Sequence, residues 1–279
     1  MTMRALGVAI GWLAGSVLRV RRAHVEAAMV RAGVADAKGT AVRMYRALGV
    51  ALVAFLRGRP LPAIDEEPLA AAIARGPVVL FASHTGNWEL AAAAAARLLA
   101  ARGRRLSVVA KPMSTRWIDR LLARLRARLG VHVIAPEGAL AAAGRALAAG
   151  DVVAMPIDQV PDRPGLAVRF LGARAVVDRA PAIVAWRSRA TVLVIGATEG
   201  RASVLDVIPA RSCSDRAGLW IDAAARRATA ALEDFVRREP ASWMWLHRRW
   251  RDLSPLAAQA NRGPWKTRSS SRAGASAAG

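Results

Sequence analysis

The chain has 279 residues, enough to bury a sizeable core in one large domain or two small ones. Its net charge of +22 points to an anionic partner, which could be nucleic acid, an anionic lipid surface or an acidic carrier protein. A general coding bias toward arginine would account for part of the amount of this charge. It accounts less well for the distribution of the charge along the chain. The single cysteine, Cys213, excludes an intrachain disulfide and a cysteine-based metal cluster.

The first expected element is an uncharged apolar segment at residues 5–18, with one arginine just before it and three soon after it. This segment is shorter than the roughly 18 to 20 residues that a membrane-spanning helix needs. No convincing small-residue cleavage site follows it, so a signal peptide is not expected. We therefore expect a membrane-associated helix over residues 1–22, lying at the interface or inserted shallowly, with a buried core helix as the alternative.

The rest of the chain divides into a helical start, an alternating middle and a polar end. Residues 23–58 read as helical, and the proline-bearing stretch around residues 60–67 reads as a loop. Strands are then expected at 78–82, 106–110, 131–134, 152–157, 191–196 and 203–208, and helices near 87–101, 115–129, 138–149, 178–188 and 219–238. This alternation predicts one α/β domain over residues 23–253, with a central, mostly parallel mixed sheet flanked by helices. The small, polar and basic residues 254–279 predict a disordered tail.

A histidine and an acid stand where the first of these strands turns into a helix, in the stretch FASHTGNWEL. His84 falls just past the carboxyl end of the strand, where ligand sites of open α/β sheets lie. Gly86 allows a tight turn and Asn87 can cap the helix that follows. Glu89, in the first turn of that helix, can face back and meet one ring nitrogen of His84, which would leave the other nitrogen free to take a proton from a substrate. A structural role for the histidine is the alternative.

Four stretches of the chain together resemble one enzyme family. SHTGNWEL resembles the H-x-x-x-x-(D/E) signature of glycerolipid acyltransferases, and its fuller form resembles the bacterial lipid A late acyltransferases and the related mannoside acyltransferases. Three further segments agree with these families in order and spacing: AKPMSTRWIDRLL at 110–122, the Asp-Gln motif and the strand after it at 152–175, and the Trp/His/Arg-Trp segment at 238–250. The resemblance covers about residues 20–252.

This resemblance implies a set of site residues. His84 would be the general base, Glu89 its orienting partner, and Asp158 a support of the polar network. The substrate-binding candidates are Lys111, Asn87, Trp88, Gln159, Arg116 and Arg120. Lys111 stands where relatives often carry arginine, and its cation would hold a phosphate or polarise the acyl carbonyl without the bidentate fork of arginine. Backbone N–H groups near Gly86 and Asn87 are candidates for the oxyanion donors. The sequence implies no metal and no bound cofactor.

Two further patterns have competing interpretations. Glu137, in IAPEGAL, mimics a Pro-Glu-Gly phosphate-binding motif, but we favour a glutamate that merely sits at a helix N-terminus. Arginines at 116, 120, 124 and 128 run beside apolar residues at 117, 121, 125 and 129, as expected for a helix that packs on the sheet and faces anionic headgroups. A merely solvated face is the alternative. The tryptophans near residue 245 suit either a membrane interface or a structural clamp under the site.

Together these features predict a membrane-associated O-acyltransferase of the lipid A late-acyltransferase type. The donor would be acyl carrier protein or acyl-CoA, the acceptor a glycolipid, and the setting the cytoplasmic face of the inner membrane, with anionic lipids as partners and no nucleic acid. A glycerophospholipid or phosphatidylinositol-mannoside acyltransferase is the alternative enzyme. An inactive basic protein that binds membranes or nucleic acid is the alternative from another class.

Overall fold

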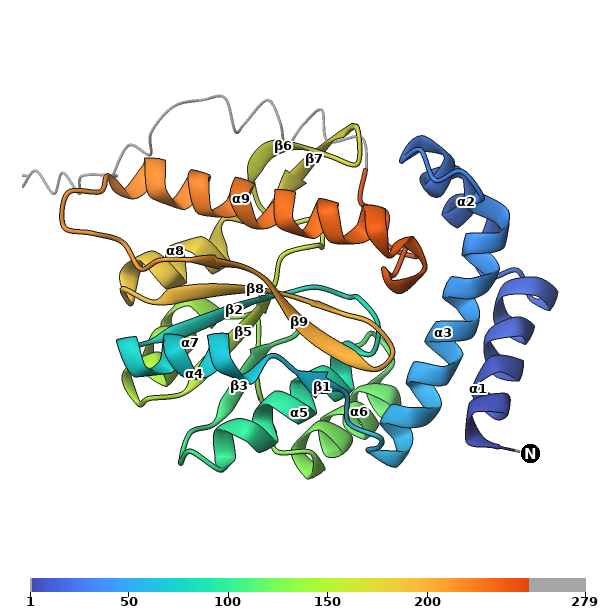
Figure 1. Cartoon of the computed structure of the whole chain (residues 1–279), viewed down its shortest axis with the longest axis horizontal. Coiled ribbons are helices and arrows are strands. Elements are labelled where there is room, and N and C mark those ends of the chain that lie inside the picture. Colours follow the sequence, from blue (N-terminus) through green and yellow to red (C-terminus); the bar gives the residue numbers. More distant parts are fainter. Residues whose placement is uncertain (1, 251–279) are drawn as a thin grey trace, which may run out of the picture.

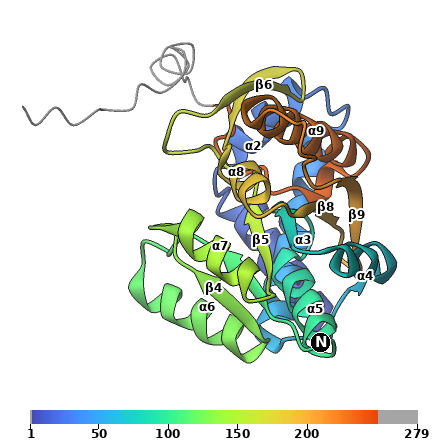
Figure 2. The same cartoon turned by 90° about the vertical axis from the view of Figure 1, so that its left-hand side faces the viewer.

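The computed structural model describes residues 2–250, which fold around one seven-stranded sheet with helices on both faces (Figures 1 and 2). The strand order is β1-β9-β8-β2-β5-β3-β4. The strands are β1 Ala63–Ile64, β2 Val78–Ala82, β3 Leu106–Val109, β4 Val131–Ile134, β5 Val152–Pro156, β8 Thr191–Ala197 and β9 Arg201–Ile208. Neighbouring strands are parallel except β8 and β9. The predicted α/β domain with a mostly parallel mixed sheet is confirmed.

Two layers of helices cover the sheet because its central strands are apolar on both faces, as parallel strands usually are. On β2, Val79 and Phe81 point into the core under one layer, whereas Val78 and Leu80 point into the core under the other. The first layer contains α7 Ala139–Ala148, α8 Ala180–Arg187 and α9 Ala217–Arg238. The second contains α4 Glu66–Arg75 and α5 Trp88–Ala100, with α6 Arg116–Arg128 packed beside α5.

The N-terminal helices lie along one side of the molecule (Figure 1). They are α1 Met3–Trp12, which continues as a π-helix over Leu13–Val17, then α2 Arg22–Arg31 and α3 Ala37–Arg57. Glycines let α1 and α3 touch backbone to backbone: a Cβ at Gly11 would lie 2.1 Å from the carbonyl oxygen of Tyr45, and one at Gly49 would lie 2.2 Å from that of Gly7. One face of α1 is thus buried on α3, while the other exposes Trp12.

Helix α3 is the one helix among residues 2–250 that is long and apolar enough to cross a membrane by itself. Met3–Val17 and Arg22–Arg31, which meet at a bend of 88°, are together also long and apolar enough for one span. Core helices of soluble proteins reach the same length and apolar character.

Three features of the structure differ from the expectations or go beyond them. The stretch around residues 60–67 is not all loop, because α4 begins at Glu66, whose acid suits a helix N-terminus. Residues 23–58 form two helices, separated by a turn in which Gly33 has a φ of +77°. A small antiparallel hairpin, β6 Leu166–Phe170 and β7 Ala173–Val177, forms a separate sheet. The tail expected at residues 254–279 lies outside the described residues.

Candidate active site

The site lies at the carboxyl ends of two neighbouring strands. β2 and β5 are parallel partners, with Ala82 opposite Pro156 in the register. His84 follows β2 by two residues and Asp158 follows β5 by two, so the sheet brings together two side chains that are far apart in the sequence. This edge is where open α/β sheets bind their ligands.

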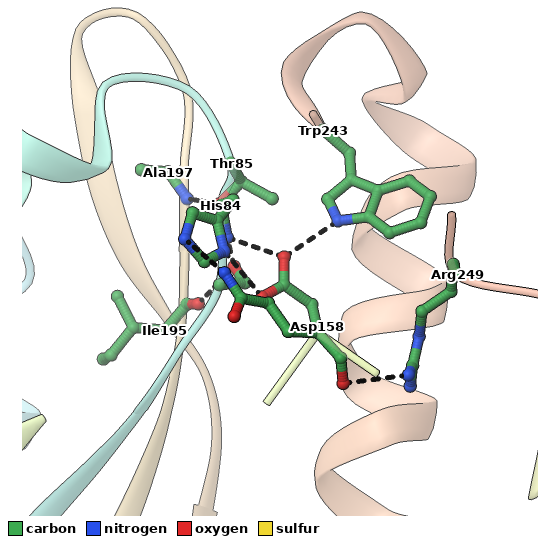
Figure 3. Close-up of polar contacts among 9 residues, drawn as sticks. His84, Thr85, Asp158, Ile195, Ala197, Trp243 and Arg249 are labelled. Atoms are coloured by element: carbon green, nitrogen blue, oxygen red, sulfur yellow. Dashed lines mark hydrogen bonds and ion pairs between the residues drawn. The ribbon is translucent and has the colours of Figure 1, made fainter. Parts of the chain in front are cut away.

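Asp158 holds both the backbone and the ring of His84 (Figure 3). The ring nitrogen Nδ1 of His84 lies 2.8 Å from Oδ1 of Asp158, and the backbone N–H of His84 donates to Oδ2 at 2.7 Å. The indole N–H of Trp243 also donates to Oδ2, at 3.0 Å. With a carboxylate opposite Nδ1, that nitrogen carries the proton, which leaves Nε2 as the basic atom of the neutral ring.

Burial and charge act in opposite directions on this pair. Burial by itself lowers the pKa of His84, but the charge of Asp158 and its hydrogen bond outweigh burial and raise that pKa above its usual value. Burial by itself would raise the pKa of Asp158, but the charge of His84 and the hydrogen bonds from His84 and Trp243 lower it well below its usual range. His84 is therefore a stronger base than an ordinary histidine, beside a carboxylate that stays ionised.

The expected contact between Glu89 and His84 is not present in the structure. Glu89 accepts two hydrogen bonds from Arg126 of α6, at 2.9 Å and 2.5 Å, and it makes no hydrogen bond to His84. Its position in the first turn of α5 directs it toward the neighbouring helix α6. This ion pair raises the pKa of Arg126, chiefly through the hydrogen bond to Glu89. Asp158, not Glu89, is the carboxylate that contacts the histidine.

Asn87 caps α5 as predicted, since its side-chain oxygen accepts from the backbone N–H of Leu90 at 3.2 Å. Its amide nitrogen donates to the carbonyl of Ala51 at 3.3 Å, so both of its side-chain polar atoms have partners within the protein. The turn before it needs glycine: Gly86 has a φ of +53°, and a Cβ there would lie 2.4 Å from the carbonyl oxygen of Thr198.

The backbone donors expected for an oxyanion are already engaged. The N–H of Gly86 donates to the carbonyl of Ser242 at 2.7 Å, and the N–H of Asn87 to that of Thr198 at 3.5 Å. The side-chain amide of Gln159 is a different candidate, because its nitrogen lies 3.3 Å from Nε2 of His84. Gln159 follows Asp158 directly, so the turn after β5 provides both contacts to the two ring nitrogens.

A large, mostly apolar cavity of about 1110 Å³ adjoins His84 and runs between α5 and the sheet. Its walls include Trp88 and Gln159 near the histidine, Leu80 and Leu106 of the sheet, and Ala92 of α5. The cavity exists partly because the helix that covers it carries a run of alanines, ELAAAAAARLLA, where larger side chains would fill the space.

The remaining predicted residues lie at different distances from the cavity. Lys111 lines it and forms an ion pair with Asp162, so its cation is already partnered. Glu137 also lines the cavity, just before α7. An acid that only favoured the start of a helix would not need to lie in the cavity wall. Arg116 and Arg120 are exposed on α6 and are not part of the cavity wall.

Helix α6 lies beside the edge strand β4 of the sheet, but only part of its apolar stripe is buried. Leu125 is buried and packs with Leu90 of α5, but Trp117 is 68% exposed and Leu121 is 40% exposed. The helix thus lies beside β4 and also contacts α5 and α3, and the outer part of its predicted apolar stripe faces outward beside the arginines.

The C-terminal segment, residues 240–250, packs against Asp158 and the turn that carries His84. The sequence did not predict these contacts. Trp243 and Trp245 are fully buried, which makes this cluster a structural clamp and not a membrane-facing belt. Arg249, only 1% exposed, donates to the carbonyl of Gln159 at 3.2 Å (Figure 3). It also donates to the carbonyl of Val176 at 2.7 Å. Burial lowers its pKa to about 10, so it remains a cation at neutral pH. The dense Trp/His/Arg pattern was the signal that could have indicated this role.

Within residues 2–250, no group of three or more His, Cys, Asp or Glu side chains is placed to hold a metal ion. A histidine paired with a buried aspartate, at the carboxyl edge of a parallel sheet and beside a long apolar cavity, is typical of an α/β enzyme site and is chemically suited to deprotonate a hydroxyl next to an apolar ligand.

Comparison with known families then identifies the chain more closely. Residues 43–252 match the family of bacterial lipid A biosynthesis acyltransferases, and the chain belongs to that family and is an acyltransferase. The resemblance inferred from the sequence motifs is confirmed. No match is found among curated proteins.

Proposed function

We propose that this protein is a membrane-associated O-acyltransferase that moves a fatty acyl chain from a thioester, on acyl carrier protein or coenzyme A, to a hydroxyl of a lipid A-type or other glycolipid. The observation that carries the proposal is the pairing of His84 with Asp158 at the end of a large apolar cavity. The pairing supplies a base for the hydroxyl, and the cavity suits an acyl chain.

In the proposed reaction, Nε2 of His84 takes the proton of the acceptor hydroxyl while its oxygen attacks the thioester carbonyl. Asp158, 2.8 Å from Nδ1, stabilises the imidazolium that forms. The tetrahedral intermediate then collapses, the C–S bond breaks, and the imidazolium returns its proton to the departing sulfur. The products are an ester and a free thiol, and His84 is neutral again.

Gln159 has a part in this sequence. Its amide lies 3.3 Å from Nε2 of His84, where the acceptor hydroxyl must bind. When the hydroxyl displaces that amide, the amide becomes free to donate to the thioester oxygen as negative charge develops there. The engagement of the Gly86 and Asn87 N–H groups by carbonyls supports this role for a side-chain donor.

The acyl chain occupies the cavity under α5. Ala91, Ala92 and Ala95 form part of its wall from the helix side, and Leu80 and Leu193 contribute to the wall from the sheet. A methylene chain in this space loses contact with water along its length, at a gain of roughly 0.8 kcal/mol per buried CH₂.

Membrane association is supported by exposed apolar side chains beside basic ones. Trp12 and Leu18 at the N-terminus are 48% and 65% exposed, and Trp117 on α6 is 68% exposed between Arg116 and Arg120. Tryptophan and arginine in this combination favour the headgroup region of an anionic bilayer.

The proposal is tested with purified protein, acyl carrier protein and CoA thioesters of matched chain length, and lipid acceptors including a lipid A precursor and lysophospholipids. Thiol release that depends on a glycolipid acceptor, and that His84→Ala abolishes, is the expected result. Release with lysophospholipid alone would favour the glycerophospholipid alternative, and no release with any pair would favour a binding protein. Lipid mass spectrometry of a deletion strain then identifies the missing acylated species.

A further inference from the structure

A second imidazole lies against His84. The ring of His247 is centred 5.1 Å from that of His84, with an angle of 72° between the planes. His247 lines the same cavity, and its Nε2 is buried without a hydrogen-bond partner among the described residues. Trp88 provides another edge contact, with its ring centroid 5.3 Å from His84 and an interplanar angle of 66°.

Hydrogen bonds hold the backbone around His247 to the N-terminal helices and to the turn that carries His84. Its carbonyl accepts from the ring of His24 at 3.2 Å, and the carbonyl before it, that of Leu246, accepts from Arg21 at 3.0 Å. The N–H of Met244, three residues before His247, donates to the backbone carbonyl of His84 at 2.9 Å. The C-terminal segment and the turn that carries His84 are therefore bound to each other directly.

Asp158 alone does not fix the orientation of His84. Its hydrogen bond holds one ring atom, Nδ1, and once the acceptor hydroxyl displaces the Gln159 amide from Nε2, the ring can tilt about Nδ1. Contacts on the ring itself remove this freedom, and edge-to-face packing of the kind seen here is a favourable geometry for aromatic pairs. A restrained ring keeps Nε2 directed toward Gln159 and the position of the acceptor hydroxyl.

The charge state of His247 suits this position. Burial, followed by the charge of His84, lowers the pKa of His247 to about 4. Arg21 and Arg249 also lower it, whereas Asp158 raises it. The ring is therefore neutral at physiological pH and does not repel the cation that forms on His84 during turnover, as a lysine in its place would.

We propose that His247 is a positioning residue of the active site, whose neutral ring packs against His84 and keeps the base aligned between Asp158 and the acceptor. The kinetic part of this inference rests on the proposed acyl transfer. It adds to the His84–Asp158 pair a residue from the C-terminal segment that acts through His84 and not on the substrate.

The test compares His247→Leu, which fills space without a flat ring, with His247→Phe, which keeps the ring. His247→Asn replaces the leucine variant if that one does not fold. His132→Ala is the matched control, because His132 lies on β4 with its ring nitrogen 3.3 Å from Ser107 and is not part of the cavity wall. Thermal unfolding of each variant measures how much of it is folded, and kcat is taken per folded enzyme.

We expect His247→Leu to lower kcat about tenfold with little change in KM for the thioester, and His247→Phe to restore most of the rate. The downfield proton resonance of the His84 Nδ1–H, assigned by its loss in Asp158→Asn, should broaden in His247→Leu and return in His247→Phe. This signal does not depend on turnover, so it still decides the inference if the unmodified protein proves inactive and the proposed function fails. Wild-type kcat and an unchanged resonance in His247→Leu, or equal losses in both variants, would overturn it.

Discussion

Replacing Asp158 by asparagine tests the central feature of the site. The carboxylate is fully buried and accepts hydrogen bonds from the His84 ring, the His84 backbone and the Trp243 indole. Asparagine keeps the shape but loses the charge, and its NH₂ group cannot accept a hydrogen bond from the N–H donors around it. The His84 ring then favours the wrong tautomer and lacks support for the imidazolium. The expected loss in kcat is about 10⁴-fold, or roughly 5 kcal/mol of transition-state stabilisation.

The pH dependence of kcat/KM gives a second measure of the same change. His84 must be neutral to act as a base, so the rate falls as the pH drops through its pKa. Burial lowers the pKa of His84, and in the wild type the charge of Asp158 and its hydrogen bond outweigh burial and raise that pKa above its usual value; Asp158→Asn removes the charge and leaves burial to lower the pKa. The acid limb of the profile should therefore move to lower pH in Asp158→Asn, while the plateau falls.

Glu89→Gln is the matched comparison, because it also neutralises one carboxylate without changing its size. It leaves Arg126 without its ion-pair partner in the cavity wall, and we expect a loss of roughly 10- to 100-fold, partly recovered by adding Arg126→Gln. Thermal unfolding separates folded from unfolded enzyme in both cases. A larger loss in Glu89→Gln than in Asp158→Asn would refute the assignment of Asp158 as the partner of His84.

Three further predictions concern the cavity and the surface. Ala95→Leu should lower kcat/KM for long-chain thioesters about tenfold and leave kcat/KM for short ones unchanged. Ala100→Leu, on the exposed end of α5, should change neither value. Equal effects on all chain lengths would contradict the acyl site. Replacing exposed Trp12 and Leu18 with serine should weaken sedimentation with anionic vesicles by about tenfold or more and make the remainder more salt-sensitive; unchanged binding would exclude this surface. Glu137→Ala should change turnover less than tenfold, and a loss equal to that of Asp158→Asn would assign Glu137 to the acceptor's phosphate.

The N-terminal segment shows what a local sequence pattern predicts and what it does not. Its apolar run predicts a helix, and α1 with its π-helical continuation occupies that stretch. The pattern did not reveal that Gly7 and Gly11 would place this helix against the backbone of α3. Small residues at helical spacing show that another backbone can approach this face closely. They do not identify which helix does so, because any helix could pack there equally well.

The sequence by itself determined the alternating strands and helices, the turn that carries His84, and the cap at Asn87, because these depend on neighbours within a few residues. It did not determine which carboxylate meets the histidine. Glu89 is near in sequence, but the start of α5 directs it to Arg126. Asp158 is far in sequence, yet it becomes adjacent because β2 and β5 are parallel neighbours in the sheet. The tertiary structure also decided the approach of His247 and the cavity under α5, since both depend on contacts between segments that no local pattern encodes.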